Sequence, residues 1–178
     1  RPFSMGDSPH SKKVQIRIAN PEFRGAFDQE DASDRGLCLN TIKVGSITLN
    51  ALFDPETKIL YDARFFTYVP ILIAVVDVFL ELARGLPIHR LSEVTADRVE
   101  SKLRDHLDTP AVDSARTMYF EEVPKIVKTL EENMNAALAL SLASASAREG
   151  GLSATEHLSQ KAETFCALPE FAQRIQIE

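Results

Sequence analysis

Residues 58–85, KILYDARFFTYVPILIAVVDVFLELARG, join a strand pattern directly to a helix pattern. Between residues 59 and 66 the side chains alternate with a period of two, which predicts a β-strand. From Pro70 the chain becomes an apolar run of helical length; proline suits a first helical turn, and Gly85 suits a helix end. The stretch therefore predicts a strand that leads into a mostly buried helix. One predicted strand face carries Ile59, Tyr61, Ala63 and Phe65, and the other carries Leu60, Asp62, Arg64 and Phe66.

Asp77 is a charged residue among the apolar residues of this helix. A buried carboxylate must be paired or neutralised, because water no longer solvates it. Alternatively, Asp77 lies on the polar side of the helix with Glu81, which follows one turn later. We expect the second arrangement. The core side of the helix should then carry Val75, Val76, Phe79 and Leu82.

Two further strands are predicted upstream, over residues 37–44 and 47–53. In the second of them, Ile47, Leu49, Ala51 and Phe53 alternate with more polar neighbours. Residues 54–57, Asp-Pro-Glu-Thr, are typical of a turn and would connect this strand to the 59–68 strand as a hairpin. The expected fold class is α+β: a three-stranded antiparallel sheet covered by helices.

The rest of the chain predicts helices separated by loops. Thr95 is a candidate N-cap for a helix over residues 96–107, with Val99, Leu103 and Leu107 on one face. Residues 28–36, rich in acidic side chains, and residues 108–117 are expected to be loops. A long helix is predicted from Pro124 to about Arg148, and residues 153–156 have the form of a capping box for a further helix. The apolar stripe of the long helix consists of Ile126, Leu130, Met134, Ala137 and Leu138.

The composition of the 178 residues excludes several classes of protein. A formal net charge of −6 and a pI near 5.3 argue against a nucleic-acid-binding surface. No stretch reaches the roughly 18 uninterrupted apolar residues of a membrane span. The two cysteines, Cys38 and Cys166, are too few for a disulfide framework; they fit either free thiols in a reducing compartment or a single bridge.

Three segments resemble the IscU/NifU-type iron–sulfur cluster assembly scaffolds. They are DARFFTY at residues 62–68, the Asn-Pro to Gly-Ala-Phe segment at residues 20–27, and EENMNAAL at residues 131–138. The resemblance implies a short helix before Asn20. It also implies three domains of the chain: a flexible lead-in at residues 1–10, an IscU-like domain at residues 11–148 and a helical C-terminal extension at residues 149–178.

In these scaffolds three cysteines and one Asp or His hold a two-iron cluster, or zinc. The resemblance places the first cysteine at Lys43-Val44-Gly45, the second at Pro70 and the third within residues 119–126, where no cysteine occurs. Lys43 could supply a positive charge in place of a metal, or it could be a solvated lysine, which we favour. We therefore expect degenerate ligand positions at Lys43, Gly45 and Pro70, no catalytic residue, no cofactor and no metal.

Two function classes follow from this resemblance. The first is a non-catalytic IscU-like protein that has lost cluster binding and serves as a structural or protein-binding subunit of a larger assembly. The second is a cluster assembly scaffold, or a regulator of that pathway. The expected partners are other protein subunits, contacted through the C-terminal helices, with no nucleic acid. Arg1 is either a cloning remnant or the first residue after a removed targeting segment, so we expect a mitochondrial location, with the bacterial cytoplasm as the alternative.

Overall fold

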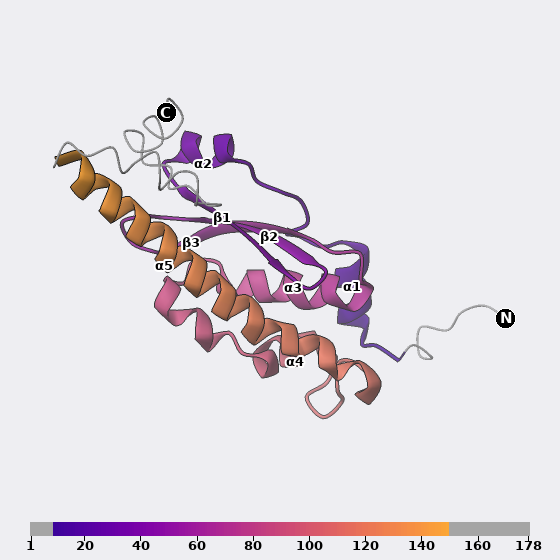
Figure 1. Ribbon diagram of the computed structural model, residues 1–178. Helices are drawn as coiled ribbons and strands as arrows, with labels where there is room; N and C mark the ends of the chain where they lie inside the picture. The colour runs from indigo at the N-terminus through magenta and orange to yellow at the C-terminus, as the bar shows by residue number, and fades with distance from the viewer. Residues whose placement is uncertain (1–8, 150–178) are drawn as a thin grey trace.

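The computed structural model describes residues 9–149, which fold into a three-stranded sheet between helices (Figure 1). Most of the predicted lead-in and nearly all of the predicted extension at residues 149–178, including its capping box, lie outside the described residues. The elements, in chain order, are α1 (Lys12–Ala19), α2 (Gln29–Arg35), β1 (Cys38–Val44), β2 (Ile47–Phe53), β3 (Leu60–Phe66), α3 (Pro70–Ala83), η2 (Ile88–Glu93), α4 (Ala96–Leu103), η3 (Ser114–Glu121) and α5 (Glu122–Glu149).

The sheet is an antiparallel meander in the order β1-β2-β3, so the predicted α+β architecture is confirmed. The turn between β1 and β2 contains Gly45 at φ +57°, a left-handed conformation that glycine adopts without a Cβ penalty. The turn between β2 and β3 is fixed by Asp54, whose carboxylate accepts hydrogen bonds from the backbone N–H groups of Glu56 (2.8 Å) and Thr57 (3.2 Å). Both connections therefore follow from turn residues in the sequence.

A β-bulge interrupts the alternation of β3. Leu52 pairs with Asp62, but Phe53 pairs with Leu60, so Tyr61 is an extra residue on β3. The bulge puts Leu60 in the same core as Ala63 and Phe65, while Tyr61 is 55% exposed. The prediction that Tyr61 shares a face with Ala63 and Phe65 is therefore wrong, because strict period-two alternation holds only where the pairing is regular.

The main core lies between the sheet and the layer of α3, α4 and α5, whereas α2 covers part of the other sheet face (Figure 1). Helix α3 is almost wholly buried, and its predicted core residues Val75, Val76 and Phe79 are inaccessible, while Leu82 is half-buried. The predicted stripe of α5 also faces the core. Its members Ile126, Leu130, Met134 and Ala137 are buried, and Leu138 is half-buried.

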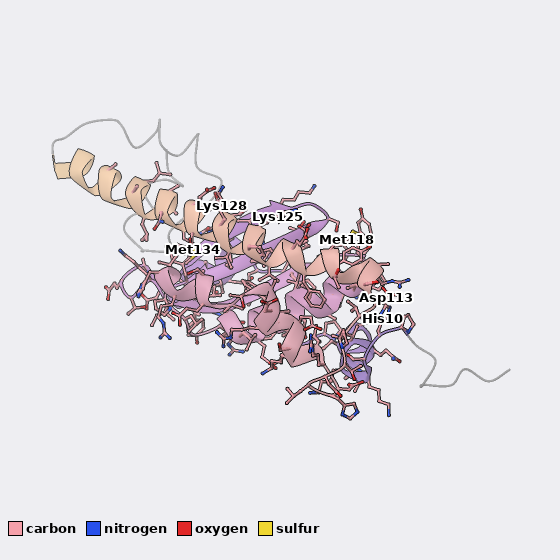
Figure 2. All side chains as sticks on the ribbon, turned by 90° about the horizontal axis from the view of Figure 1, so that it is seen from below. His10, Asp113, Met118, Lys125, Lys128 and Met134 are labelled. Atoms are coloured by element: carbon pink, nitrogen blue, oxygen red, sulfur yellow. The ribbon has the colours of Figure 1, made fainter. Side chains whose placement is uncertain are left out.

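Helix α5 presents two different sides. Met134 is fully buried, whereas Lys125 and Lys128, on the same helix, are exposed (Figure 2). With 28 residues, α5 is about 42 Å long and extends past the end of the sheet (Figure 1). Among residues 9–149, no helix is long and apolar enough to cross a membrane.

Three local predictions differ from the structure. The helix expected to reach residue 107 ends at Leu103, and Leu107 is 90% exposed. Arg104 turns the chain there, since its guanidinium donates to the Glu100 carboxylate and to the Leu107 carbonyl oxygen. Residues 29–35 form α2 rather than a loop, because Asp28 and Asp31 form a reciprocal capping box. The second predicted loop is shorter than expected, since η3 begins at residue 114.

Asp77 also corrects a prediction, because it is fully buried instead of lying on a polar helix side. Its carboxylate accepts from the Arg17 guanidinium at 2.7 Å and from the backbone N–H of Phe23 at 2.8 Å. Arg17 also contacts Glu81 at 2.7 Å, and Glu81 contacts Lys102 at 2.8 Å. These four side chains, Arg17, Asp77, Glu81 and Lys102, are called the Asp77 cluster below. The cluster ties α1 and α4 to α3.

Candidate functional site

The three regions to which the family resemblance assigns the metal ligands, residues 43–45, 70 and 119–126, meet at one end of the sheet. Ser46, in the β1–β2 turn, lies 3.3 Å from Thr67, measured between the two hydroxyl oxygens. Thr67 belongs to the connection between β3 and α3. A Cβ atom built on Gly45 would lie 3.9 Å from Oε2 of Glu122, the first residue of α5. We call Gly45, Ser46, Thr67, Glu122 and the adjoining Pro70 the junction.

Two of the three predicted ligand positions lie at the junction and one does not. Gly45 is in the turn, and Pro70 is the exposed first residue of α3. Lys43 lies one residue before Val44, which points into the core, so Lys43 is on the opposite face of β1. Its side chain is exposed. The structure therefore places Lys43 as a solvated lysine of the outer sheet face and not as a charge inside the junction.

The side chains that meet at the junction are ones that sequence reasoning missed. Thr67 is fully buried, and its hydroxyl also accepts from the backbone N–H of Val69 at 3.3 Å. Glu122 is half-buried and forms an ion pair with Lys125 at 3.3 Å. The sequence evidence that could have identified Thr67 was small: this residue is part of the DARFFTY segment that resembles the family. Its proximity to Ser46 depends on the strand pairing, which the sequence does not state.

The donor chemistry of the junction does not fit an iron–sulfur cluster. Clusters and zinc sites of this kind depend on thiolates, which are soft, charged ligands. Ser46 and Thr67 offer neutral hydroxyls, Glu122 offers one hard carboxylate, and Gly45 and Pro70 offer no side-chain donor. Within the described residues 9–149, no group of three His, Cys, Asp or Glu side chains could hold a metal ion.

The junction instead fixes the start of α3. Val69 is the N-cap residue of α3 and makes no side-chain cap hydrogen bond. Pro70 occupies the first turn, where its missing N–H leaves one fewer donor to satisfy. Thr67 binds the Val69 N–H and contacts Ser46, so the turn and the helix start are joined by neutral hydrogen bonds. The arrangement positions the backbone at the start of α3.

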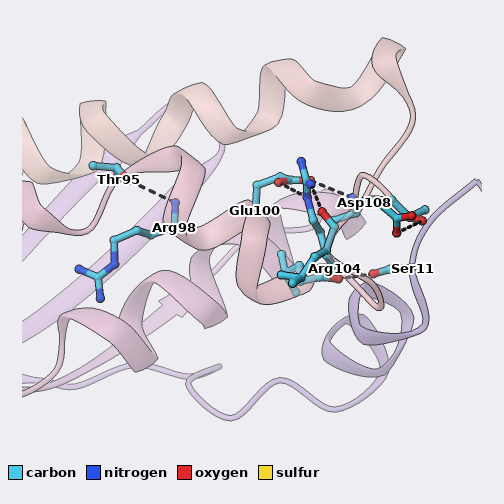
Figure 3. A network of polar contacts seen from close by, with 10 residues as sticks. Ser11, Thr95, Arg98, Glu100, Arg104 and Asp108 are labelled. Atoms are coloured by element: carbon cyan, nitrogen blue, oxygen red, sulfur yellow. Dashed lines mark hydrogen bonds and ion pairs between the residues drawn. The ribbon is translucent and has the colours of Figure 1, made fainter.

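A groove of about 470 Å³ lies elsewhere, between the start of α4 and the first turns of α5. Its wall is rigid at α4: Thr95 caps the helix by accepting from the Arg98 N–H at 3.2 Å, and Glu100 accepts from Arg104 (Figure 3). At the end of the same helix, the Ser11 hydroxyl donates to the Leu103 carbonyl oxygen. The groove is lined by Ser92, Val94, Thr95, Ala96, Asp97, Pro124, Val127, Lys128 and Glu131. The lining combines apolar side chains with charged ones of both signs, Asp97, Lys128 and Glu131.

The comparison with known proteins agrees with the fold. The model of the NifU-like N-terminal domain matches residues 9–136, more than half of the chain, and the match includes all three segments of the junction. No curated protein matches the chain at a significant level. The meander sheet covered by helices is the architecture that the matching segments led us to expect. By sequence and by fold, this chain belongs to the family of NifU-like N-terminal domains, which relates it to iron–sulfur cluster assembly.

Proposed function

We propose that this chain is a non-catalytic NifU-like protein that has lost cluster binding and serves as a protein-binding subunit of a larger assembly. The observation that supports the proposal is the donor set of the junction. The assigned positions Gly45 and Pro70 have no side-chain donor, and the side chains beside them, Ser46, Thr67 and Glu122, offer two hydroxyls and one carboxylate where a cluster needs thiolates. Hydroxyls at neutral pH are weak ligands for iron or zinc, so a cluster there would have little to hold it.

The proposed partners are other protein subunits. The family match ends at residue 136, whereas α5 continues to Glu149. Leu138 and Leu140 are half-buried on the described part of this continuation. A long helix that leaves its own sheet needs another apolar surface for its stripe, and the C-terminal extension at residues 149–178 would add to that contact. The proposed location is mitochondrial, with the bacterial cytoplasm as the alternative.

The test is anaerobic reconstitution with ferrous iron and sulfide, followed by metal analysis of the desalted protein. We expect no visible cluster absorbance and far less than one metal ion per chain. The matched positive control is the triple variant Ser46→Cys/Thr67→Cys/Glu122→Cys, kept reduced, which should acquire metal because it places three thiolates at the junction. About one zinc or two irons per wild-type chain would overturn the proposal.

The alternative is a scaffold or regulator of cluster assembly, which the family match favours. In that case the missing ligands would come from another chain. Reconstitution in the presence of a cluster-binding NifU-like scaffold separates the two. Metal retained by a mixed complex, and lost in the variant Glu122→Gln, would support the alternative. Metal retained by the scaffold alone would support the proposed loss of cluster binding.

A further inference from the structure

The outer face of the sheet is closed at one end and open at the other. Over the closed end, α2 packs its buried Ala32 against Leu52 and Leu37 (Figure 1). In the middle, Asn50 donates to the Thr41 hydroxyl at 2.9 Å and accepts from the Phe27 N–H at 3.3 Å. The polar groups there have partners within the domain. No helix of the described residues covers the next row, at the end nearest the β1–β2 turn.

That open row has a defined composition. Lys43 on β1 pairs with Thr48 on β2, which pairs with Phe66 on β3. Arg24 lies beside β3, where its backbone bridges to Phe65, and its guanidinium reaches the row because it lies over the Phe66 ring, 5.4 Å from the ring centre. Phe66 is 50% exposed, and Lys43 and Arg24 are exposed. We call Lys43, Thr48, Phe66 and Arg24 the open row.

The charges of the open row have no counterparts within the described part of the chain. Neither Lys43 nor Arg24 forms an ion pair with a carboxylate among residues 9–149, although the whole chain carries a net charge of −6. Other cations of the outer face are engaged, as Arg64 is with Asp62 at 2.8 Å. Two cations without a carboxylate partner, one of them stacked over a half-exposed aromatic ring, form a surface complementary to an acidic, partly apolar segment.

We propose that the open row binds an extended acidic segment of a protein partner. Neighbouring strands lie about 4.8 Å apart, so the backbones at Lys43 and Arg24 are separated by three strand spacings, about 14 Å. An extended peptide rises about 3.4 Å per residue, and residues i, i+2 and i+4 share one face. Carboxylates at i and i+4 therefore match the two cations, and an apolar side chain at i+2 meets Phe66.

A polyanion fits the open row less well. Nucleic-acid binding needs many phosphate contacts, and the row offers only the two cations Lys43 and Arg24. This inference rests on the proposed protein-binding function and names the chemistry of the partner.

The test is fluorescence anisotropy of the full chain with a labelled peptide whose core is Glu-Ser-Phe-Ser-Glu. The same residues in the order Glu-Glu-Ser-Ser-Phe give the control peptide. We expect the spaced peptide to bind more tightly than the control peptide. Its affinity should fall as salt rises from about 50 to 300 mM, because salt screens exposed charges. The variants Lys43→Glu and Arg24→Glu should each weaken binding at least tenfold. Lys12→Glu is the matched control, since Lys12 is an exposed lysine on α1, outside the open row, and it should change binding less than twofold.

Each outcome decides the matter. Equal binding of both peptides, equal effects of Lys43→Glu and Lys12→Glu, or tighter binding of a single-stranded oligonucleotide would overturn the inference. Thermal unfolding of each variant verifies that it is folded. We expect both variants to fold, because Lys43 and Arg24 are exposed. Metal content is measured separately, so failure of the peptide test and failure of the proposed loss of cluster binding are distinguishable.

Discussion

Two polar clusters lie along α3. Neutral hydrogen bonds hold one of them together, and ion pairs hold the other. At the start of the helix, the junction joins Ser46 and Thr67 through neutral hydroxyls 3.3 Å apart. Further along, the Asp77 cluster joins Asp77 to Arg17 through opposite charges 2.7 Å apart. A buried charge thus lies where α1 and α4 contact α3. Neutral hydrogen bonds lie at the end of α3 where the family resemblance places an iron–sulfur cluster. The difference shows that a buried carboxylate in this domain has a structural role.

The largest expected effect sets the scale for both clusters. Phe79 is inaccessible in the core of α3, close in sequence to Asp77. Phe79→Ala should lower the free energy of unfolding by about 3–5 kcal/mol, because it removes buried apolar surface and leaves a cavity. Urea denaturation measures the loss, and Tyr68→Ala, at a position 74% exposed, is the control with little expected effect. A loss below about 1 kcal/mol would contradict the core position of Phe79.

The next effect tests the charged cluster. Arg17→Met should lower the free energy of unfolding by about 3 kcal/mol, because it leaves the buried Asp77 carboxylate without its countercharge. The double variant Arg17→Met/Asp77→Asn should be more stable than Arg17→Met alone. An amide carries no charge, and its oxygen can still accept from the Phe23 N–H. If adding Asp77→Asn to Arg17→Met lowered the stability further, the Asp77 charge would not be the cause of the loss in Arg17→Met.

The junction should respond more weakly. Thr67→Val removes a buried hydroxyl that binds Ser46 and the Val69 N–H, so the expected loss is about 1 kcal/mol in urea denaturation. Thr48→Val, on the half-buried outer face of β2, is the matched control and should have a smaller effect. A Thr67→Val effect as large as that of Arg17→Met would remove the contrast between the two clusters.

The smallest effect is a dependence on pH. Burial alone would raise the pKa of Glu81, but hydrogen bonds from Lys102 and Arg17 outweigh it and hold that pKa below the ordinary 4.5. A depressed folded-state pKa contributes stability that is present above the unfolded pKa and is lost as pH falls through the folded value. Denaturation midpoints below pH 4.5 should therefore fall less steeply with acid in Glu81→Gln than in the wild type. Identical slopes would show that Glu81 does not contribute.

Most of the fold could be predicted from local pattern. The alternating residues of β2, the turn at residues 54–57 and the apolar run from Pro70 correspond to the observed strand, turn and helix. The errors occur where a local pattern competes with a longer-range one. Tyr61 fits regular alternation, but the pairing of β3 with β2 makes it a bulge. Residues 28–36 look like an acidic loop, although the Asp28 capping box is enough to start a short helix.

The sites could be predicted only in part. The resemblance selected segments that the structure does bring together, including Gly45 and Pro70. It could not select Thr67 as the contact of Ser46, because that proximity depends on strand register. Asp77 was misplaced for a similar reason: its countercharge, Arg17, is 60 residues away in the chain, whereas helical spacing reports neighbours within one turn.

The proline at the first position of α3 has an evolutionary consequence. Cysteine can replace serine through a single base change, but no single base change converts a proline codon to a cysteine codon. Any intermediate residue at position 70 would also give up a fixed backbone angle that favours the helix start, without yet gaining a ligand. On the proposed function, descendants of this chain would recover cluster binding at Pro70 only through steps that selection does not reward.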